Sequence, residues 1–291
     1  MTDDNKIISI FRGVASMQKQ LGILEAALGQ NDELTVYEQM ELLARRQRPT
    51  IPLCQALQTA LLTVESWKNP YVTLNAARRL IENQPQGHAY AETALPFYIR
   101  AAEELGTESP LLGFHSLRFA LIYCQTDSAN ELLAFNATER LCLTSNPVAA
   151  LNMVNHFIEL RRTWPADNPL RPRLVGMICA LAATIGPHAP EEALDAYASL
   201  FRDIRHEGGE RLAAYIEAVA PLALRVGAQA PTEAAVCLSE ILDCLEPAHP
   251  LYAAAQDYKA RFEARLNPGD YQGQSPVAPA DFLKHNRPQP S

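Results

Sequence analysis

The sequence predicts an all-helical protein built from pairs of helices that recur about every 40 residues. Apolar residues return at spacings of three and four along almost the whole chain, which is the period of an amphipathic helix. A proline followed by one apolar pattern returns five times, at Pro70, Pro110, Pro147, Pro190 and Pro231. The spacings between these prolines are 40, 37, 43 and 41 residues.

Each of these prolines is expected in the first turn of a helix, where its missing N–H is not needed. Apolar residues follow four, seven and eleven positions later, so each helix presents one face to a core. The residues at the seventh position are Ala77, Leu117, Val154, Tyr197 and Leu238. The third position holds a small residue each time, which would let another helix approach closely. These residues are Thr73, Gly113, Ala150, Ala193 and Ala234.

A second helix is expected in each unit. The expected ranges are 88–105, 128–143, 170–185, 209–226 and 248–266. Ser128 and Glu131 have the spacing of a capping box at the start of one of them. Helix pairs at this period indicate an α-solenoid, because stacked pairs bury faces that one pair leaves open.

The region 69–266 resembles the helical-repeat class that includes tetratricopeptide, HEAT and armadillo proteins. The resemblance is one of architecture, since the tetratricopeptide Trp-Leu-Gly-Tyr pattern and a HEAT consensus are not present. It implies a right-handed α-solenoid of about five helix pairs, with an extended curved surface that holds a peptide or another protein. The alternative is a non-repeating helical bundle whose prolines fall at similar spacings.

Three regions are predicted: an N-terminal helical cap over 1–66, a solenoid over 67–266, and a Pro-rich flexible tail over 267–291. The first helix has a coiled-coil-like seam, formed by Ile7, Ile10, Val14, Met17, Leu21, Leu24 and Leu28. Its flanking positions are nearly uncharged, which favours packing against the chain's own helices. A homodimer formed through this helix is the alternative. Helices near 34–47 and 52–66 complete the cap.

Composition restricts the classes of partner and the compartment. The net charge of −8 argues against non-specific binding to nucleic acid, so we expect no nucleic-acid partner. The six cysteines form no CxxC pair and suit small buried residues in a reducing compartment. The apolar part of the longest uncharged run is too short to span a bilayer. With no secretory signal pattern at the start, we expect a cytoplasmic protein.

Motifs for chemistry are not found in the sequence. There is no phosphate-binding glycine loop, no HExxH and no GxSxG. The segment HEGGE at 206–210 resembles a metal-binding helix only superficially, because two adjacent glycines weaken a helix by about 1 kcal/mol each. We therefore predict no catalytic residue, no metal and no cofactor. An all-helical enzyme with polar residues gathered from distant helices stays open as an alternative.

The first candidate binding surface is the position eight residues after each proline. It holds Arg78, Arg118 and Asn155, followed by Ala198 and Ser239. If the repeats stack in register, Arg78 and Arg118 lie at one height on consecutive helices and could hold a carboxylate or a phosphate. The alternative is that each arginine extends past the core to a local acidic partner.

The second candidate surface is the segment 161–173, which contains Arg161, Arg162, Trp164, Arg171 and Arg173. A basic loop with an exposed aromatic residue can anchor a peptide or a nucleic-acid base. The alternative is a proline-stiffened connection whose tryptophan packs on the helix ends.

These features predict a non-catalytic protein-interaction module. It would act as an adaptor, scaffold or chaperone-like binder, with a protein or peptide partner of acidic character. The alternative is an all-helical enzyme or small-molecule binder. The step from a helical-repeat fold to binding is an analogy between architectures.

Overall fold

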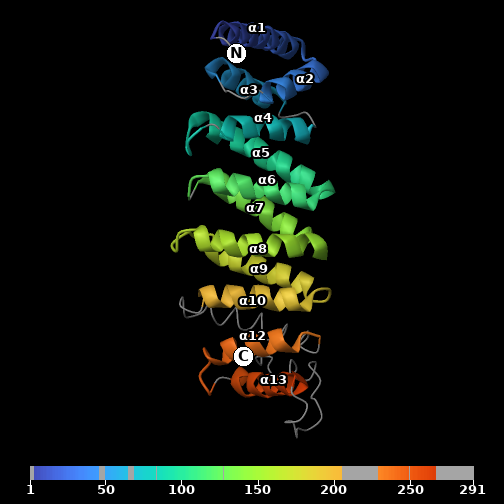
Figure 1. Cartoon of the computed structure of the whole chain (residues 1–291), viewed down its shortest axis with the longest axis vertical. Helices are drawn as coiled ribbons and strands as arrows, with labels where there is room; N and C mark the ends of the chain where they lie inside the picture. Colours follow the sequence, from blue (N-terminus) through green and yellow to red (C-terminus); the bar gives the residue numbers. More distant parts are fainter. Residues whose placement is uncertain are drawn as a thin grey trace, which may run out of the picture. The chain divides into compact units, whose positions relative to one another are not determined.

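The computed structural model describes residues 3–45, 50–64, 69–82, 84–126, 128–204, 229–248 and 250–266. These residues form twelve α-helices and contain no strand, which confirms the all-helical prediction. The helices follow one another along the chain in the order of their labels (Figure 1). The chain divides into two compact units, Met1–Leu141 and Cys142–Ser291.

The first unit contains three N-terminal helices, α1 (Asp3–Gln30), α2 (Glu33–Ala44) and α3 (Ile51–Thr63). They are followed by α4 (Pro70–Glu82), α5 (Ala89–Glu108), α6 (Pro110–Tyr123) and most of α7 (Ala129–Thr144). The second unit contains α8 (Pro147–Thr163), α9 (Arg171–Ile185), α10 (Pro190–Ile204), α12 (Pro231–Leu242) and α13 (Pro250–Leu266). The predicted helix at 209–226 lies outside the described residues.

All five predicted prolines are the first residue of a helix, namely α4, α6, α8, α10 and α12. The asparagines that precede two of them act as caps. The Asn69 Oδ1 atom accepts a hydrogen bond of 3.3 Å from the Val72 N–H, and the Asn146 Oδ1 atom accepts one of 2.9 Å from the Ala149 N–H. At the starts of α4 and α8 the proline and the cap therefore act together, because the cap satisfies an N–H group that has no partner inside the helix.

Helices that follow one another in sequence pack against each other. In the first unit α4 packs on α5 and α5 packs on α6; in the second, α8 packs on α9, α9 on α10 and α12 on α13. All residues seven positions after a proline are buried: Ala77, Leu117, Val154, Tyr197 and Leu238. The predicted apolar face is thus the face that these helices turn toward their neighbours.

Gly113 allows α5 and α6 to approach each other closely. A Cβ atom at this position would lie 2.9 Å from the carbonyl oxygen of Ala102 and would collide with the Cα atom of Gly106. The backbones of α5 and α6 are therefore in direct contact at this point. The prediction that the third position after the proline is small because another helix approaches is confirmed here.

The N-terminal helix α1 packs on α2 and α3 of its own chain, and Leu24 and Ala27 are buried in that contact region. Packing within the chain is therefore observed for this helix, while a homodimer stays a prediction.

At the start of α7, the Ser128 Oγ atom accepts a 3.1 Å hydrogen bond from the Glu131 N–H. This is the serine half of the predicted capping box.

The six cysteines are thiols, four of them buried and two half-buried. Burial raises the pKa of the Cys124, Cys179 and Cys237 thiols to about 12, with smaller contributions from nearby carboxylates at Cys124 and Cys237. These side chains behave as small apolar core residues, as the sequence indicates.

Among the described helices, none is both long and apolar enough to cross a membrane.

Candidate functional site

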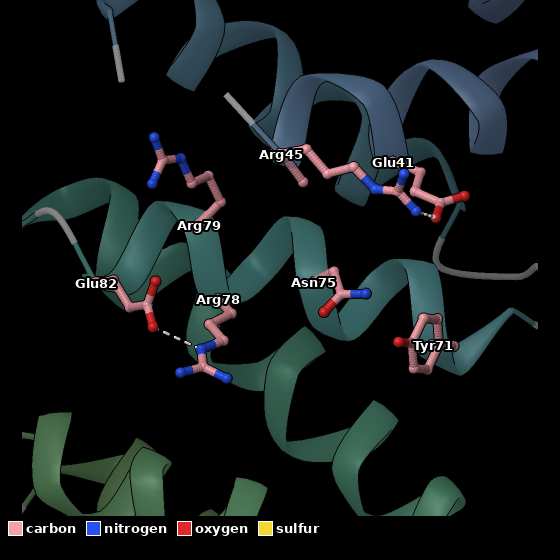
Figure 2. A pocket seen from close by; sticks show the side chains of 8 residues that line it. Glu41, Arg45, Tyr71, Asn75, Arg78, Arg79 and Glu82 are labelled. Atoms are coloured by element: carbon pink, nitrogen blue, oxygen red, sulfur yellow. Dashed lines mark hydrogen bonds and ion pairs between the residues drawn. The ribbon is translucent and has the colours of Figure 1, made fainter. Parts of the chain in front are cut away.

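A polar pocket of about 410 Å³ lies in the first unit, between the end of α2 and the exposed face of α4 (Figure 2). Its wall on α2 consists of Glu41, Ala44 and the following Arg45. Its wall on α4 consists of Tyr71, Asn75, Arg78, Arg79 and Glu82. Three guanidiniums and two carboxylates therefore surround one pocket.

The amphipathic pattern of α4 explains why it presents these side chains. Tyr71, Asn75, Arg78 and Glu82 are separated by four, three and four residues, so they form one stripe along the helix. Ala76, Ala77 and Leu80 face away from this stripe and are buried. Burial of that side of α4 thus leaves the polar stripe at the surface.

Arg45 extends the pocket from a second helix. It follows the last residue of α2, and its backbone N–H donates a 3.3 Å hydrogen bond to the Glu41 carbonyl oxygen. Its guanidinium forms an ion pair with the Glu41 carboxylate one turn earlier, as Figure 2 shows. The Arg45 side chain is 73% exposed, so this pair contributes little to folding stability and leaves the guanidinium at the surface.

Arg78 is held more firmly than Arg45. Its Nε atom donates a 2.6 Å hydrogen bond to the Glu82 Oε1 atom, and its guanidinium carbon lies 5.1 Å from the centroid of the Phe119 ring on α6. Phe119 in turn stacks on Tyr123, with ring centroids 4.4 Å apart. Burial acts to lower the pKa of Arg78, but the hydrogen bond and charge of Glu82 raise it above its usual value. Arg78 is therefore a permanent cation with a constrained orientation, although its side chain is 52% exposed.

Arg79 faces the interior more than Arg78 does. It is half-buried and lines the pocket. Burial raises the pKa of the Cys54 thiol, and the charge of Arg79 opposes that rise, which places the guanidinium within electrostatic range of α3. The guanidiniums of Arg45, Arg78 and Arg79 exceed the two carboxylates by one positive charge.

The residues predicted eight positions after each proline differ in burial and in whether they line the pocket. Arg78 lines the pocket, whereas Arg118 is half-buried on α6 beside Phe119 and is not among the residues that line it. Asn155 is exposed on α8, in the second unit. At the two remaining positions Ala198 is buried and Ser239 is half-buried.

The predicted basic segment 161–173 connects α8 to α9. Arg161 is 1% exposed, so its side chain belongs to the interior of the second unit. Arg162 is exposed, and Trp164, Arg171 and Arg173 are half-buried. Solvent therefore reaches four of the five residues predicted for this surface.

The connection between α8 and α9 is organised by a buried asparagine. Asn168 is 3% exposed, and its Oδ1 atom accepts a 2.8 Å hydrogen bond from the Leu170 N–H. The backbone N–H of Trp164 donates a 3.0 Å hydrogen bond to the Leu160 carbonyl oxygen and closes the last turn of α8. This segment is therefore an ordered connection between two helices.

Sequence reasoning found Arg78 but missed the other residues of the pocket. The stripe from Tyr71 to Glu82 could have been found, because its spacing of four and three is visible beside the buried pattern of the same helix. Arg45 carried no such signal, because it comes from another helix and only the packing of α2 on α4 brings it to the stripe.

The part of the chain that the structure describes contains no group of three or more His, Cys, Asp or Glu side chains placed to hold a metal ion. The segment at 206–210 lies outside that part.

Comparisons of the chain with protein-family models, with curated proteins and with solved structures found no match.

Proposed function

We propose that the chain is a protein-interaction module, an adaptor, scaffold or chaperone-like binder, that holds an acidic protein or peptide at the pocket between α2 and α4. The observation that carries this proposal is the grouping of Arg45, Arg78, Arg79 and Tyr71 around one surface pocket. Arginine and tyrosine are enriched among the residues that dominate binding energy at protein interfaces. An excess of positive charge at the pocket favours an acidic partner.

Small-molecule binding is the second candidate, since a volume of about 410 Å³ falls within the range of ligand sites. Such sites, however, are lined mostly by apolar side chains with a few polar groups. In this pocket Ala44 is the one aliphatic lining residue and Tyr71 the one aromatic one, and the other lining residues are charged or amide side chains. This lining favours a macromolecular partner that keeps part of its surface in water.

The fold itself supports a binding role. We propose that the proline-led helices and their successors form a right-handed α-solenoid of about five pairs, in a cytoplasmic protein. The shared proline starts and the packing of sequence neighbours within each unit support this arrangement. Solenoids present extended surfaces to peptides and proteins.

The proposal is tested by cross-linked affinity enrichment from the native host's lysate, read by quantitative mass spectrometry. The pocket variant is Arg45→Glu/Arg78→Glu, and the control is Arg100→Glu/Arg140→Glu. The control changes the net charge equally at two exposed arginines of the same unit, outside the pocket.

We expect some proteins to be enriched by both wild type and control and to be lost with the pocket variant. Circular dichroism should show that all three proteins are folded at the temperature of the experiment. The same set of partners in all three samples would contradict the proposed site.

A further inference from the structure

We propose that the outer face of α6 is a docking surface for an amphipathic helix of a partner protein, and that this helix carries an acidic residue at the edge of its apolar face. The inference rests on the proposed function, because it adds a second contact surface beside the pocket and names the partner's chemistry. It is carried by the exposed apolar side chains of α6, by their contrast with the other proline-led helices, and by Arg78, which borders both this face and the pocket.

Apolar side chains occupy both the inner and the outer face of α6. The inner face is buried and consists of Gly113, Phe114, Ser116, Leu117, Ala120 and Leu121. Along the outer face lie Leu112, His115, Phe119 and Ile122, which we call the α6 stripe. They are separated by three, four and three positions, so they share one side of the helix. A helix that is apolar all round normally has both faces covered, yet Leu112 is 40% exposed and Ile122 is 51% exposed.

The other proline-led segments have polar residues where the α6 stripe is apolar. Nine positions after the proline α6 has Phe119, and the equivalent residues are Arg79, His156, Ser199 and Glu240. Twelve positions after the proline α6 has Ile122, and the equivalent residues are Glu82, Glu159, Arg202 and Asp243. All five residues at the twelfth position are exposed. A position that faces solvent and is charged after four prolines but apolar after one indicates a contact surface on α6.

Arg78 connects the α6 stripe to the pocket. It lines the pocket, and its guanidinium carbon lies 5.1 Å from the centroid of the Phe119 ring. In Figure 2 its side chain points away from Glu41 and Arg45. The hydrogen bond to Glu82 is made through Nε, so the edge formed by the two Nη atoms can bind a carboxylate of a partner. An acidic residue beside the partner's apolar face would therefore meet this guanidinium when that face covers the α6 stripe.

The charge beside the stripe favours a different protein over a second copy of this chain. A symmetric dimer places the same patch on both subunits, so the guanidinium of Arg78 would approach a surface that carries the same guanidinium. The Glu82 carboxylate of that second copy would already be bonded to its own Arg78. Like charges brought together at an interface oppose binding, whereas an acidic residue on another protein favours it.

The period of the α6 stripe sets the sequence pattern expected of the partner. Leu112 and Ile122 are ten residues apart, which corresponds to about 15 Å of helix. Helices pack on one another through side chains spaced three and four residues apart on each of them. A partner helix of about three turns, with apolar residues at these spacings and Asp or Glu next to them, would therefore cover the stripe.

The test is selection of a displayed library of random peptides, each long enough for about four helical turns, on the folded full-length protein. We expect enriched peptides to have apolar residues at spacings of three and four, with Asp or Glu beside them. Synthetic versions should gain helical circular dichroism when they bind. Replacing the acid by its amide should weaken binding about tenfold, as measured by fluorescence anisotropy.

Variants of the protein locate the contact. Ile122→Ser should weaken peptide binding about tenfold, because it removes an exposed apolar side chain from the stripe. Val236→Ser is the matched control and should leave the affinity unchanged. Val236 is a 49% exposed apolar residue of the proline-led helix α12, in the other compact unit. Both side chains face solvent, so both variants should keep the circular dichroism spectrum of wild type.

Three results would overturn the inference: no enriched peptide, enriched peptides without apolar residues at helical spacing, or affinities that Ile122→Ser leaves unchanged. A dimer that analytical ultracentrifugation detects and that Ile122→Ser dissociates would assign the stripe to a second copy and overturn it as well.

The lysate experiment separates this inference from the proposed function. If a partner is lost in Arg45→Glu/Arg78→Glu but kept in Ile122→Ser, the interaction module stands at the pocket and the α6 inference falls. If wild type and both variants enrich the same proteins, the pocket and the α6 stripe both fall. A partner lost in both variants and kept in Val236→Ser is the result that we expect.

Discussion

The guanidinium of Arg78 lies over the ring of Phe119, with its carbon atom 5.1 Å from the ring centroid. This contact joins the exposed stripe of α4 to α6, the helix that begins at the next of the recurring prolines. Phe119 also packs against Tyr98 of α5, with ring centroids 5.3 Å apart. The orientation of a pocket residue thus depends on an aromatic cluster that lies outside the pocket lining.

The cation–π contact should be measurable as a coupling energy. We expect a double-mutant cycle with Arg78→Met and Phe119→Leu to give about 0.5–1 kcal/mol of coupling in the free energy of unfolding. Urea denaturation of wild type, both single variants and the double variant provides the four values. Strictly additive effects would show that the contact adds no stability beyond ordinary packing.

Gly113→Ala should destabilise the first unit. Alanine is the better helix former by about 1 kcal/mol, but its Cβ atom would meet the backbone of α5, and overpacking of this kind costs about 1–3 kcal/mol. Gly22→Ala in α1 is the control, since the added methyl group would have nothing within 4 Å apart from its chain neighbours and the backbone of its own helix. Thermal unfolding should show a lower midpoint for Gly113→Ala and an equal or higher one for Gly22→Ala. A rise in both would mean that α5 and α6 separate without cost.

Asn146→Ala should weaken the start of α8. The substitution removes the hydrogen bond from the Ala149 N–H and should cost about 1 kcal/mol of unfolding free energy. Asn146→Ser should retain most of that stability, because serine is also a good cap. Denaturant titration of the three proteins distinguishes capping from a general loss of contacts, since the latter would affect serine and alanine alike.

Stability should fall at alkaline pH because of the buried thiols. The pKa of Cys237 rises from 9.0 in the unfolded reference to about 12 in the folded protein, mainly through burial. The folded state therefore keeps a proton that the unfolded state releases, so the stabilisation is full below pH 9 and is lost between pH 9 and 12. At pH 10 one such thiol should cost about 1.4 kcal/mol relative to neutral pH.

Cys237→Ala isolates this contribution. The difference in unfolding free energy between neutral pH and pH 10 should be smaller in the variant than in wild type by about 1.4 kcal/mol, as measured by urea titration at each pH. The loss of packing at this position is the same at both pH values and cancels in the difference. Equal pH dependence in the two proteins would contradict the raised pKa.

The sequence predicted the starts of the helices better than it predicted the site. A proline fixes its own φ angle and lacks an N–H, so its preference for the first turn is a local property that any window of sequence reveals. Gly113 and its equivalents were also predictable, because a small residue at one position of a repeated pattern points to a close neighbour. Both inferences use residues of a single helix.

The pocket required information that no single helix contains. Arg45 reaches the stripe of α4 only through the packing of α2, and the contact of Arg78 with Phe119 depends on how α6 lies beside α4. Arg161 is a second example. Its charge led to the prediction that it lies at the surface, but the packing of α8 places its side chain in the interior. Charge indicates exposure on average, and a tertiary fold can override it for one long side chain.

The packing of helices on their sequence neighbours also affects the rate at which the chain folds. When contacting segments are close in sequence, the chain closes only short loops to form them, and folding is fast because little chain entropy is lost before contacts compensate for it. The α4–α5 and α12–α13 contacts are of this local kind and lie in different compact units. We therefore expect each unit to nucleate from its own adjacent helices, so that the N-terminal unit can acquire its structure while the rest of the chain is still being synthesised.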